Sequence, residues 1–273
     1  MGANGYLVTE LIDAGLNRRE ARWLVEEYMP EDHESIAALR RAAQRRIDGE
    51  PLQYVIGHWP FRQLDLDLDE RVLIPRPETE ELVALALAEF SDGERRAPVI
   101  VDMGCGSGAI GLSLVLELAQ IGVAATLVCV DESTDALDVA RSNAVKHGVE
   151  GVSFVVSSWF DALATTLRGT IDLIVANPPY VSADEFATLD PVLRYEPFGA
   201  LVAEDTVLAP GFEDVATIIR HSSEWLSHGG LLICEHGNMQ REATLDAAHE
   251  ARFTQVADLD DLYGNPRFLV ARR

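Results

Sequence analysis

The sequence predicts an α/β protein in which a doubly wound, Rossmann-like sheet follows a small helical region and a β-hairpin. Three observations support this fold class. Strand and helix patterns alternate from residue 98 onward, the early strand patterns are almost wholly apolar, and the first fifty residues carry only helical periodicity. Apolar strands are expected where helices cover both faces of a parallel sheet. A chain of 273 residues is long enough for one large or two modest domains.

Residues 1–50 are predicted to form a helical N-terminal domain. Three groups of apolar residues have helical spacing: Leu7, Leu11 and Ile12; Trp23, Leu24 and Tyr28; and Ile36, Leu39 and Ala43. Gly15-Leu16-Asn17 and Met29-Pro30 interrupt the pattern between them. We therefore expect a small bundle, with the aromatic pair Trp23 and Tyr28 in its core.

Residues 51–76 are predicted to form a β-hairpin connector. Leucine and aspartate alternate over residues 64–69, and this period of two indicates a strand with one face in water. We expect residues 71–74 to pair with that strand before the following prolines end it. A helix should then run from Pro77 to about Phe90, because acidic residues in its first turn suit the helix dipole.

The third domain, residues 77–273, carries seven predicted strands separated mostly by helical stretches. The predicted strands are Val99–Asp102, Thr126–Asp131, Ser153–Val156, Ile171–Ala176, Leu231–Glu235, Phe253–Ala257 and Phe268–Ala271. Alternation of this kind predicts a doubly wound sheet, whose ligands bind beyond the carboxyl ends of the strands.

A glycine-rich loop follows the first of these strands. Its three glycines stand at alternate positions, which permits a tight turn into a helix and leaves no side chain to block a ligand. The second strand ends at Asp131, whose carboxylate can accept hydrogen bonds from both hydroxyls of a ribose. The candidate cofactor residues in this region are Asp102, Gly104, Cys105, Gly106, Ser107, Gly108 and Asp131.

Two cofactors are compatible with this loop. Residues 106–111 match the G-x-G-x-x-G pattern of dinucleotide-binding enzymes, and Asp131 follows at the interval that NAD enzymes use. Two features favour S-adenosylmethionine instead. Asp102 precedes the glycines, where its charge can meet an ammonium group, and Gly104 makes the loop longer than the NAD pattern requires.

The tetrapeptide Asn177-Pro178-Pro179-Tyr180 follows the fourth strand, at the predicted ligand-binding edge of the sheet. An amide nitrogen is a poor nucleophile, so an enzyme that methylates it must hold it in line with the methyl group. The Asn177 oxygen and the Pro178 carbonyl can each accept one N–H, while Tyr180 walls in the planar group. The tetrapeptide thus predicts methyl transfer to a planar nitrogen, with Asn177, Pro178 and Tyr180 catalytic and Pro179 completing the substrate site.

The chain resembles the release-factor glutamine methyltransferases, the HemK/PrmC family, over almost its whole length. The motifs that carry the resemblance are Gly49–Tyr54, Arg71–Glu80, the glycine loop, Asn177–Tyr180, Arg194–Pro197 and Glu235–Gly237. Among them, Ile74-Pro75-Arg76-Pro77-Glu78-Thr79-Glu80 is the most specific.

The resemblance implies a helical substrate-recognition domain, a hairpin connector and a seven-stranded class I methyltransferase domain. It also implies an activity: methylation of the side-chain amide nitrogen (N5) of the glutamine in the Gly-Gly-Gln motif of class I peptide chain release factors, which modulates translation termination. By position, Asn177 through Tyr180 bind the glutamine amide, and Asn177 also lies beside the cofactor. Arg76 and Glu78 are expected to organise the site. The positions implied to bind S-adenosylmethionine are Gly104, Gly106, Gly108, Asp131 and Trp159.

The sequence departs from the family pattern at two places. Ser158 stands where the family commonly has an acidic residue before the tryptophan, so an adenine contact there is weaker or rebuilt. Residues 206–210 look like a short insertion, which either alters a loop on the substrate side or has no effect. Glu196 is expected either to shape the substrate site or to form an ordinary ion pair.

The composition argues against nucleic acid as a partner. The net charge of −23 would repel phosphates and suits a basic protein, and we read the four arginines between residues 40 and 46 as a solvated helix face. No stretch approaches the length of a membrane span, and the N-terminal residues lack a signal-peptide pattern. The three scattered cysteines and seven histidines lack metal-ligand spacing. We expect a cytoplasmic monomer with reduced thiols.

Three alternative functions remain open from the sequence. The same chemistry on a glutamine of a ribosomal protein is one, although the Pro-Arg-Pro-Glu-Thr-Glu segment argues against it. Methylation of adenine N6 in DNA is another, because adenine also presents a conjugated NH2 group; the acidic charge and the lack of an evident DNA-recognition domain oppose it. The third is a cofactor-binding module without catalytic activity, which the complete motif set disfavours.

Overall fold

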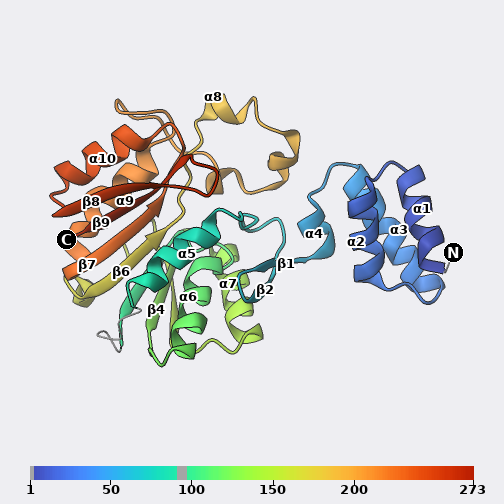
Figure 1. Cartoon of the computed structure of the whole chain (residues 1–273), viewed down its shortest axis with the longest axis horizontal. Helices are drawn as coiled ribbons and strands as arrows, with labels where there is room; N and C mark the ends of the chain where they lie inside the picture. Colours follow the sequence, from blue (N-terminus) through green and yellow to red (C-terminus); the bar gives the residue numbers. More distant parts are fainter. Residues whose placement is uncertain (1–2, 91–96) are drawn as a thin grey trace.

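The computed structural model describes residues 3–90 and 97–273 and has three parts, which Figure 1 shows in order along the chain. A helical bundle stands to one side, a short helix and a hairpin follow it, and a large α/β unit holds the rest. The first two parts comprise α1 (Ala3–Asp13), α2 (Arg18–Tyr28), α3 (His33–Ile47), α4 (Leu52–Ile56), β1 (His58–Phe61) and β2 (Leu64–Asp67).

Local sequence explains where the bundle helices begin and end. The Asn17 side chain accepts hydrogen bonds from the backbone N–H groups of Arg19 and Glu20, which caps α2. The Asp32 side chain caps α3 in the same way, and α2 ends at Met29, which adopts a left-handed conformation with φ of 35°. The predicted helical periodicity is therefore confirmed across the bundle.

Trp23 lies at the junction of the bundle and the hairpin rather than deep in the bundle. Its ring meets the ring of Trp59 in β1 edge to face, with centroids 5.6 Å apart, and the Arg19 guanidinium lies 4.3 Å from its centroid. Tyr28 is likewise half-buried and packs against the bundle core. The expected core position holds only in part, because both aromatics lie at the edge of the core rather than within it.

The hairpin forms, but the predicted second strand is wrong. β1 pairs antiparallel with β2, whereas residues 71–74 are not a strand. Side chains from elsewhere bind the backbone of that segment: the Tyr54 hydroxyl donates to the Val72 carbonyl at 2.5 Å, and Glu196 accepts from the Ile74 N–H at 3.0 Å. Because the Val72 carbonyl and the Ile74 N–H are bonded to these side chains, residues 71–74 do not pair with the hairpin as a further strand.

The α/β unit contains a seven-stranded sheet with the order β5-β4-β3-β6-β7-β9-β8. All neighbouring strands are parallel except β9, which runs antiparallel between β7 and β8. Several predicted strands have shifted bounds: β7 starts earlier than expected, β8 starts and ends later, and β9 extends beyond its expected range at both ends, while β3 and β5 differ by one residue at one end. The strands are β3 (Val99–Met103), β4 (Thr126–Asp131), β5 (Val152–Val156), β6 (Ile171–Ala176), β7 (Leu226–Glu235), β8 (Gln255–Asp260) and β9 (Pro266–Arg272).

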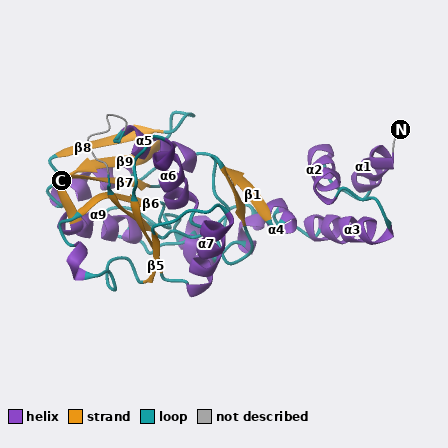
Figure 2. Ribbon diagram, turned by 90° about the horizontal axis from the view of Figure 1, so that it is seen from below, coloured by secondary structure: helices purple, strands orange, loops and turns teal. Residues whose placement is uncertain are grey.

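Helices cover both faces of this sheet, as Figures 1 and 2 show. One apolar core joins the hairpin, α5, α6 and α7 to one face, and a second core joins α9 and α10 to the other. The apolar strands predicted for a doubly covered sheet are thus confirmed. The helices are α5 (Thr79–Ala88), α6 (Ala109–Gln120), α7 (Thr134–Lys146), α8 (Ala183–Phe186), α9 (Glu213–Trp225) and α10 (Arg241–Glu250), with short 3-10 turns at Thr165–Leu167, Pro191–Tyr195 and Phe198–Ala200.

Gly111 lets α6 approach the sheet closely. Its N–H donates to the Asp102 carboxylate at 2.8 Å, and a Cβ at this position would lie 2.9 Å from both that carboxylate and the Leu127 side chain. Alanine normally stabilises a helix interior relative to glycine by about 1 kcal/mol. Here the clash outweighs that gain, so we expect Gly111→Ala to lower the free energy of unfolding by about 2 kcal/mol, measured by urea denaturation.

Gly199→Ala is the matched control for this substitution. A Cβ on Gly199 would meet its nearest atom, a Glu132 oxygen, at 3.8 Å, which is ordinary contact. The control should unfold at nearly the wild-type urea concentration. Stabilisation by Gly111→Ala would contradict the close packing between α6 and the sheet.

Candidate active site

A cavity of about 370 Å³ lies at the carboxyl ends of β3, β4 and β6. Six residues expected from the sequence line it: Gly104, Gly106, Asp131, Trp159, Asn177 and Pro179. The others lie behind its wall or next to it: Asp102, Cys105, Ser107, Gly108 and Pro178 are buried, and Tyr180 is half-buried. The strand ends therefore bring the two predicted groups, the glycine loop and the tetrapeptide, to a single cleft.

The glycine loop turns in a way that only glycine adopts easily. Gly104, Gly106 and Gly108 have φ values of 70°, 52° and 82°. A Cβ on Gly106 would meet nothing within 4 Å, so this glycine leaves open space beside the cleft. A Cβ on Gly108 would lie 2.8 Å from the Leu112 side chain. The N–H groups of Gly104 and Cys105 both bind the Val130 carbonyl, which fixes the loop to β4.

Asp131 faces the cleft at the end of β4. One carboxylate oxygen accepts the Gly106 N–H at 2.9 Å, and the other accepts the Ser133 N–H at 3.0 Å. Burial raises the pKa of Asp131, and these two hydrogen bonds oppose that rise. Each oxygen retains acceptor capacity, so the pair suits two neighbouring hydroxyl groups.

Asp102 is fully buried beneath the loop. Its Oδ2 accepts the Gly111 N–H at 2.8 Å, whereas its Oδ1 has no hydrogen-bond partner among the residues that the structure describes. Burial raises its pKa to about 7. A buried carboxylate oxygen without a partner is costly to the folded state. Such an arrangement fits a site built for a positively charged ligand group.

Trp159 and Asp214 close another side of the cleft. Trp159 adopts a φ of 45°, which is unusual for a non-glycine residue, and its indole N–H donates to the Asp214 carboxylate at 3.1 Å. Burial raises the pKa of Asp214. Sequence reasoning missed Asp214, because it lies in α9, 55 positions after its partner. The exposed Ser158 also lines the cleft beside them.

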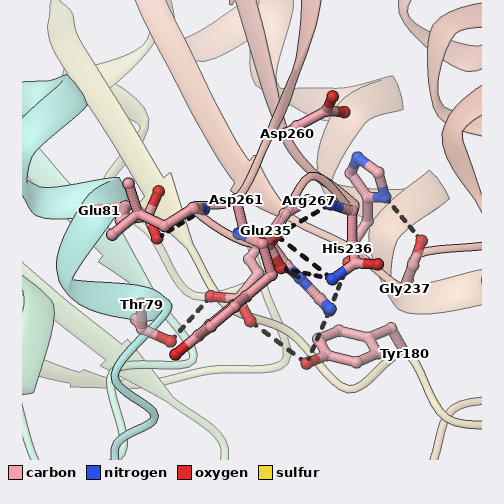
Figure 3. Close-up of polar contacts among 12 residues, drawn as sticks. Thr79, Glu81, Tyr180, Glu235, His236, Gly237, Asp260, Asp261 and Arg267 are labelled. Atoms are coloured by element: carbon pink, nitrogen blue, oxygen red, sulfur yellow. Dashed lines mark hydrogen bonds and ion pairs between the residues drawn. The ribbon is translucent and has the colours of Figure 1, made fainter.

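The tetrapeptide residues are held by hydrogen bonds outside the cleft. The Asn177 side-chain NH2 donates to the Thr79 hydroxyl at 3.1 Å, which leaves the Asn177 oxygen for another partner. The Tyr180 hydroxyl donates to Glu235 at 3.2 Å, as Figure 3 shows. Burial also raises the pKa of Tyr180, so the phenol stays protonated. The Arg267 guanidinium lies 5.8 Å from the Tyr180 ring centroid.

Glu235 is almost fully buried at the end of β7 and receives a second hydrogen bond, from the Thr79 hydroxyl at 2.8 Å. Burial raises its pKa, while the Thr79 hydrogen bond, the Arg267 charge and the Tyr180 hydrogen bond lower it. Both Glu235 and Thr79 fall within motifs noted in the sequence. No role for them was predicted there, because their contact joins residues 156 positions apart.

Arg76 and Glu196 form an ion pair with 2.6 Å between their nearest atoms. Because Glu196 also accepts the Ile74 N–H, it connects the segment before α5 to the turn at Pro191–Tyr195. Glu196 is expected from the sequence either to shape the substrate site or to form an ion pair, and the ion pair is confirmed. The pair also lines a second cavity of about 410 Å³, shared with Trp23 and Arg46 of the bundle.

Residues 206–210, expected from the sequence to be a short insertion, form a compact and largely exposed turn. The Thr206 hydroxyl accepts hydrogen bonds from the N–H groups of Leu208 and Ala209, and Val207 is fully exposed. All three cysteines are buried and free. Within residues 3–90 and 97–273, no cluster of histidine, cysteine and carboxylate side chains could hold a metal ion. No helix in the same ranges is long and apolar enough to cross a membrane.

The sheet order, the antiparallel β9, the glycine loop followed by Asp131 and the strand-end tetrapeptide define a class I methyltransferase. Comparison with known proteins agrees. Residues 84–192 match the family model described as the methyltransferase small domain. Among solved structures, the methyltransferase RsmC of T. thermophilus aligns with a TM-score of 0.59 at 14% identity, covering 79% of this chain and 49% of that one. This likeness concerns the fold.

Curated relatives are similar over most of their length. The release factor glutamine methyltransferase of Bordetella pertussis is 38% identical over 270 residues, which cover 94% of this chain and 95% of the relative. That of Aliivibrio fischeri is 35% identical, covering 88% of this chain and 80% of the relative. The chain therefore belongs to the release factor glutamine methyltransferase family. The family expected from the sequence motifs is confirmed, and the NAD alternative for the glycine loop is set aside.

Proposed function

We propose that this protein transfers a methyl group from S-adenosylmethionine to a glutamine side-chain amide nitrogen (N5). The glutamine is that of the Gly-Gly-Gln motif in class I peptide chain release factors, so the modification modulates translation termination. One observation carries the proposal: Asn177 donates its NH2 group to Thr79, at the wall of the cleft, and keeps its oxygen for a substrate N–H. The names of the relatives support the choice of release factors as substrates.

The cleft fits S-adenosylmethionine on the chemistry of its residues. The Asp131 carboxylate suits the two ribose hydroxyls, and the open side of Gly106 leaves room for the ligand beside the loop. Trp159 offers an aromatic surface, and the unpartnered oxygen of Asp102 suits a positive charge. When bound, this cofactor supplies an electrophilic methyl group on a sulfonium.

The residues of this chain then have to hold the glutamine amide. We propose that the Asn177 oxygen and the Pro178 carbonyl each accept one N–H of the substrate NH2, which fixes its plane. Pro179 and the half-buried Tyr180 confine the planar group, and the two prolines stiffen the backbone that presents the acceptors. Orientation and charge stabilisation of this kind lower the barrier without a strong base near the nitrogen.

We propose that each of the three domains has its own function. Residues 1–50 recognise the release factor, residues 51–76 connect that domain to the next, and residues 77–273 carry the methyltransferase site. The second cavity lies between the bundle and the Arg76–Glu196 pair, so a substrate loop can contact both parts there. The charge of −23 favours a basic protein surface over nucleic acid. Such an enzyme works as a monomer in the cytoplasm, where translation factors act.

Methyl transfer from labelled S-adenosylmethionine tests this function directly. We expect a purified class I release factor to accept label, and its variant with the Gly-Gly-Gln glutamine replaced by alanine to accept none. Ribosomal proteins and adenine-containing DNA serve as the competing substrates. Equal labelling of the release factor and its alanine variant, or preferential labelling of either competing substrate, would refute the proposal.

A further inference from the structure

A chain of hydrogen bonds connects the substrate-facing amide to a buried carboxylate. The Asn177 NH2 donates to the Thr79 hydroxyl at 3.1 Å, and that hydroxyl donates to Glu235 at 2.8 Å. Figure 3 shows the Thr79–Glu235 part of this chain beside Tyr180. Its three members come from the end of β6, the start of α5 and the end of β7.

The direction of these hydrogen bonds determines which way the Asn177 amide faces. A threonine hydroxyl carries a single proton, and a carboxylate can only accept. Because the Thr79 proton is donated to Glu235, the Thr79 oxygen can only accept from Asn177. The nitrogen end of the amide must then face Thr79, and its oxygen end is left for the substrate.

The carboxylate at the far end of the chain is itself held in place. Glu235 is 1% exposed, and its second oxygen accepts the Tyr180 hydroxyl at 3.2 Å. Arg267 donates toward that Tyr180 oxygen at 3.4 Å and to the His236 carbonyl at 3.1 Å. The Tyr180 proton therefore points to Glu235, and both carboxylate oxygens are occupied by donors.

We propose that Thr79 and Glu235 are positioning residues, which fix the Asn177 side chain with its oxygen toward the nitrogen that receives the methyl group. This inference rests on the proposed glutamine methylation. If the Asn177 amide were reversed, its NH2 would face the substrate NH2, and two donors cannot bond to each other. The two ends of the Asn177 amide have nearly the same shape, so shape alone does not fix its orientation. The chain of hydrogen bonds through Thr79 and Glu235 excludes the unproductive orientation.

The test uses Thr79→Val, which keeps the side-chain shape and removes the hydroxyl. Methylation of a release factor should lose about tenfold to a hundredfold in kcat, because the substitution removes the hydrogen bond that favours the productive orientation and leaves the Asn177 NH2 without its acceptor. The KM for the release factor and the Kd for S-adenosylhomocysteine, measured by calorimetry, should stay within about twofold of wild type. Thr79→Ser restores the hydroxyl and should restore most of kcat.

Thr244→Val is the matched control. Thr244 is a buried threonine in α10, and its hydroxyl has no hydrogen-bond partner among the residues that the structure describes. Its replacement should leave kcat unchanged, whereas a general effect of buried threonine substitution would lower it as well.

Glu235→Gln provides a second variant in case Thr79→Val does not fold. Since Tyr180 must still donate, the glutamine oxygen faces Tyr180 and its NH2 faces Thr79. The Thr79 proton then turns toward Asn177, and kcat should fall with KM unchanged. Wild-type kcat in either folded variant would overturn the inference. Failure of the wild-type enzyme to methylate the release factor would instead refute the proposed function.

Discussion

Asn177→Ala is expected to lower the kcat of release-factor methylation by about a hundredfold to a thousandfold. In the proposed mechanism this substitution removes the oxygen that orients the glutamine NH2 and stabilises the positive charge developing on it, and groups of this kind contribute on that scale. Asn177 lies at the cleft wall, and Asp131 and the glycine loop are left intact. The affinity for S-adenosylmethionine should therefore change only a few-fold. Single-turnover transfer of labelled methyl measures the rate of the methylation step, and calorimetry measures the affinity for S-adenosylmethionine.

The control for this substitution is Asn238→Ala, which changes an exposed asparagine between β7 and α10. It should show wild-type kcat and affinity. If Asn177→Ala retained wild-type turnover, Asn177 would have no part in the mechanism. The inferred positioning of Asn177 by Thr79 would then have no effect on catalysis.

Asp102→Asn is expected to stabilise the protein without cofactor and to weaken cofactor binding. Folded Asp102 keeps its proton up to about pH 7, whereas an unfolded aspartate releases it near pH 3.9. The folded state therefore binds the extra proton between these values, and wild-type stability falls as the pH rises through them. The Asp102→Asn variant has no titrating group at this position, so its free energy of unfolding does not show this fall with pH. It should gain about 2 kcal/mol in unfolding free energy relative to wild type between pH 5 and pH 7.

Urea denaturation at the two pH values measures this gain, with Asp246→Asn as the control on an exposed face of α10. If the control changed the pH dependence of stability as much as Asp102→Asn does, the effect would not be specific to Asp102. The same Asp102→Asn variant should bind S-adenosylmethionine at least about tenfold more weakly, because a neutral amide cannot balance a positive charge. If the unfolding free energies of Asp102→Asn and wild type differed by the same amount at pH 5 and pH 7, the raised pKa of Asp102 would be contradicted.

Sequence reasoning identified the parts of the fold that depend on local pattern. Strand and helix alternation and the apolar strands predicted a doubly wound sheet, and the structure contains it. The hairpin was predicted with the wrong partner strand, because the hydrogen bonds of residues 71–74 go to Tyr54 and Glu196. No local pattern reveals a side-chain contact across 122 positions.

The candidate site divides in the same way. Residues at strand ends, such as Asp131 and Asn177, were found from their position after an apolar run, and both line the cleft. Asp214, Thr79 and Glu235 were not assigned roles, because each forms its hydrogen bond with a side chain that is remote in sequence. Their residue types are also common on helices and strands, so composition does not distinguish them.

The interior position of β9 has a consequence for folding order. β9 is the last of the seven strands along the chain, yet it lies between β7 and β8, and Glu235 on β7 pairs with Phe268 on β9. Contacts between segments distant in sequence form slowly. A folding intermediate that lacks β9 leaves β7 with an open edge and Tyr180 without Arg267. The contact of Arg267 with Tyr180 therefore forms only when this last strand is in place, so the set of hydrogen bonds around Glu235 is complete only in the fully assembled sheet.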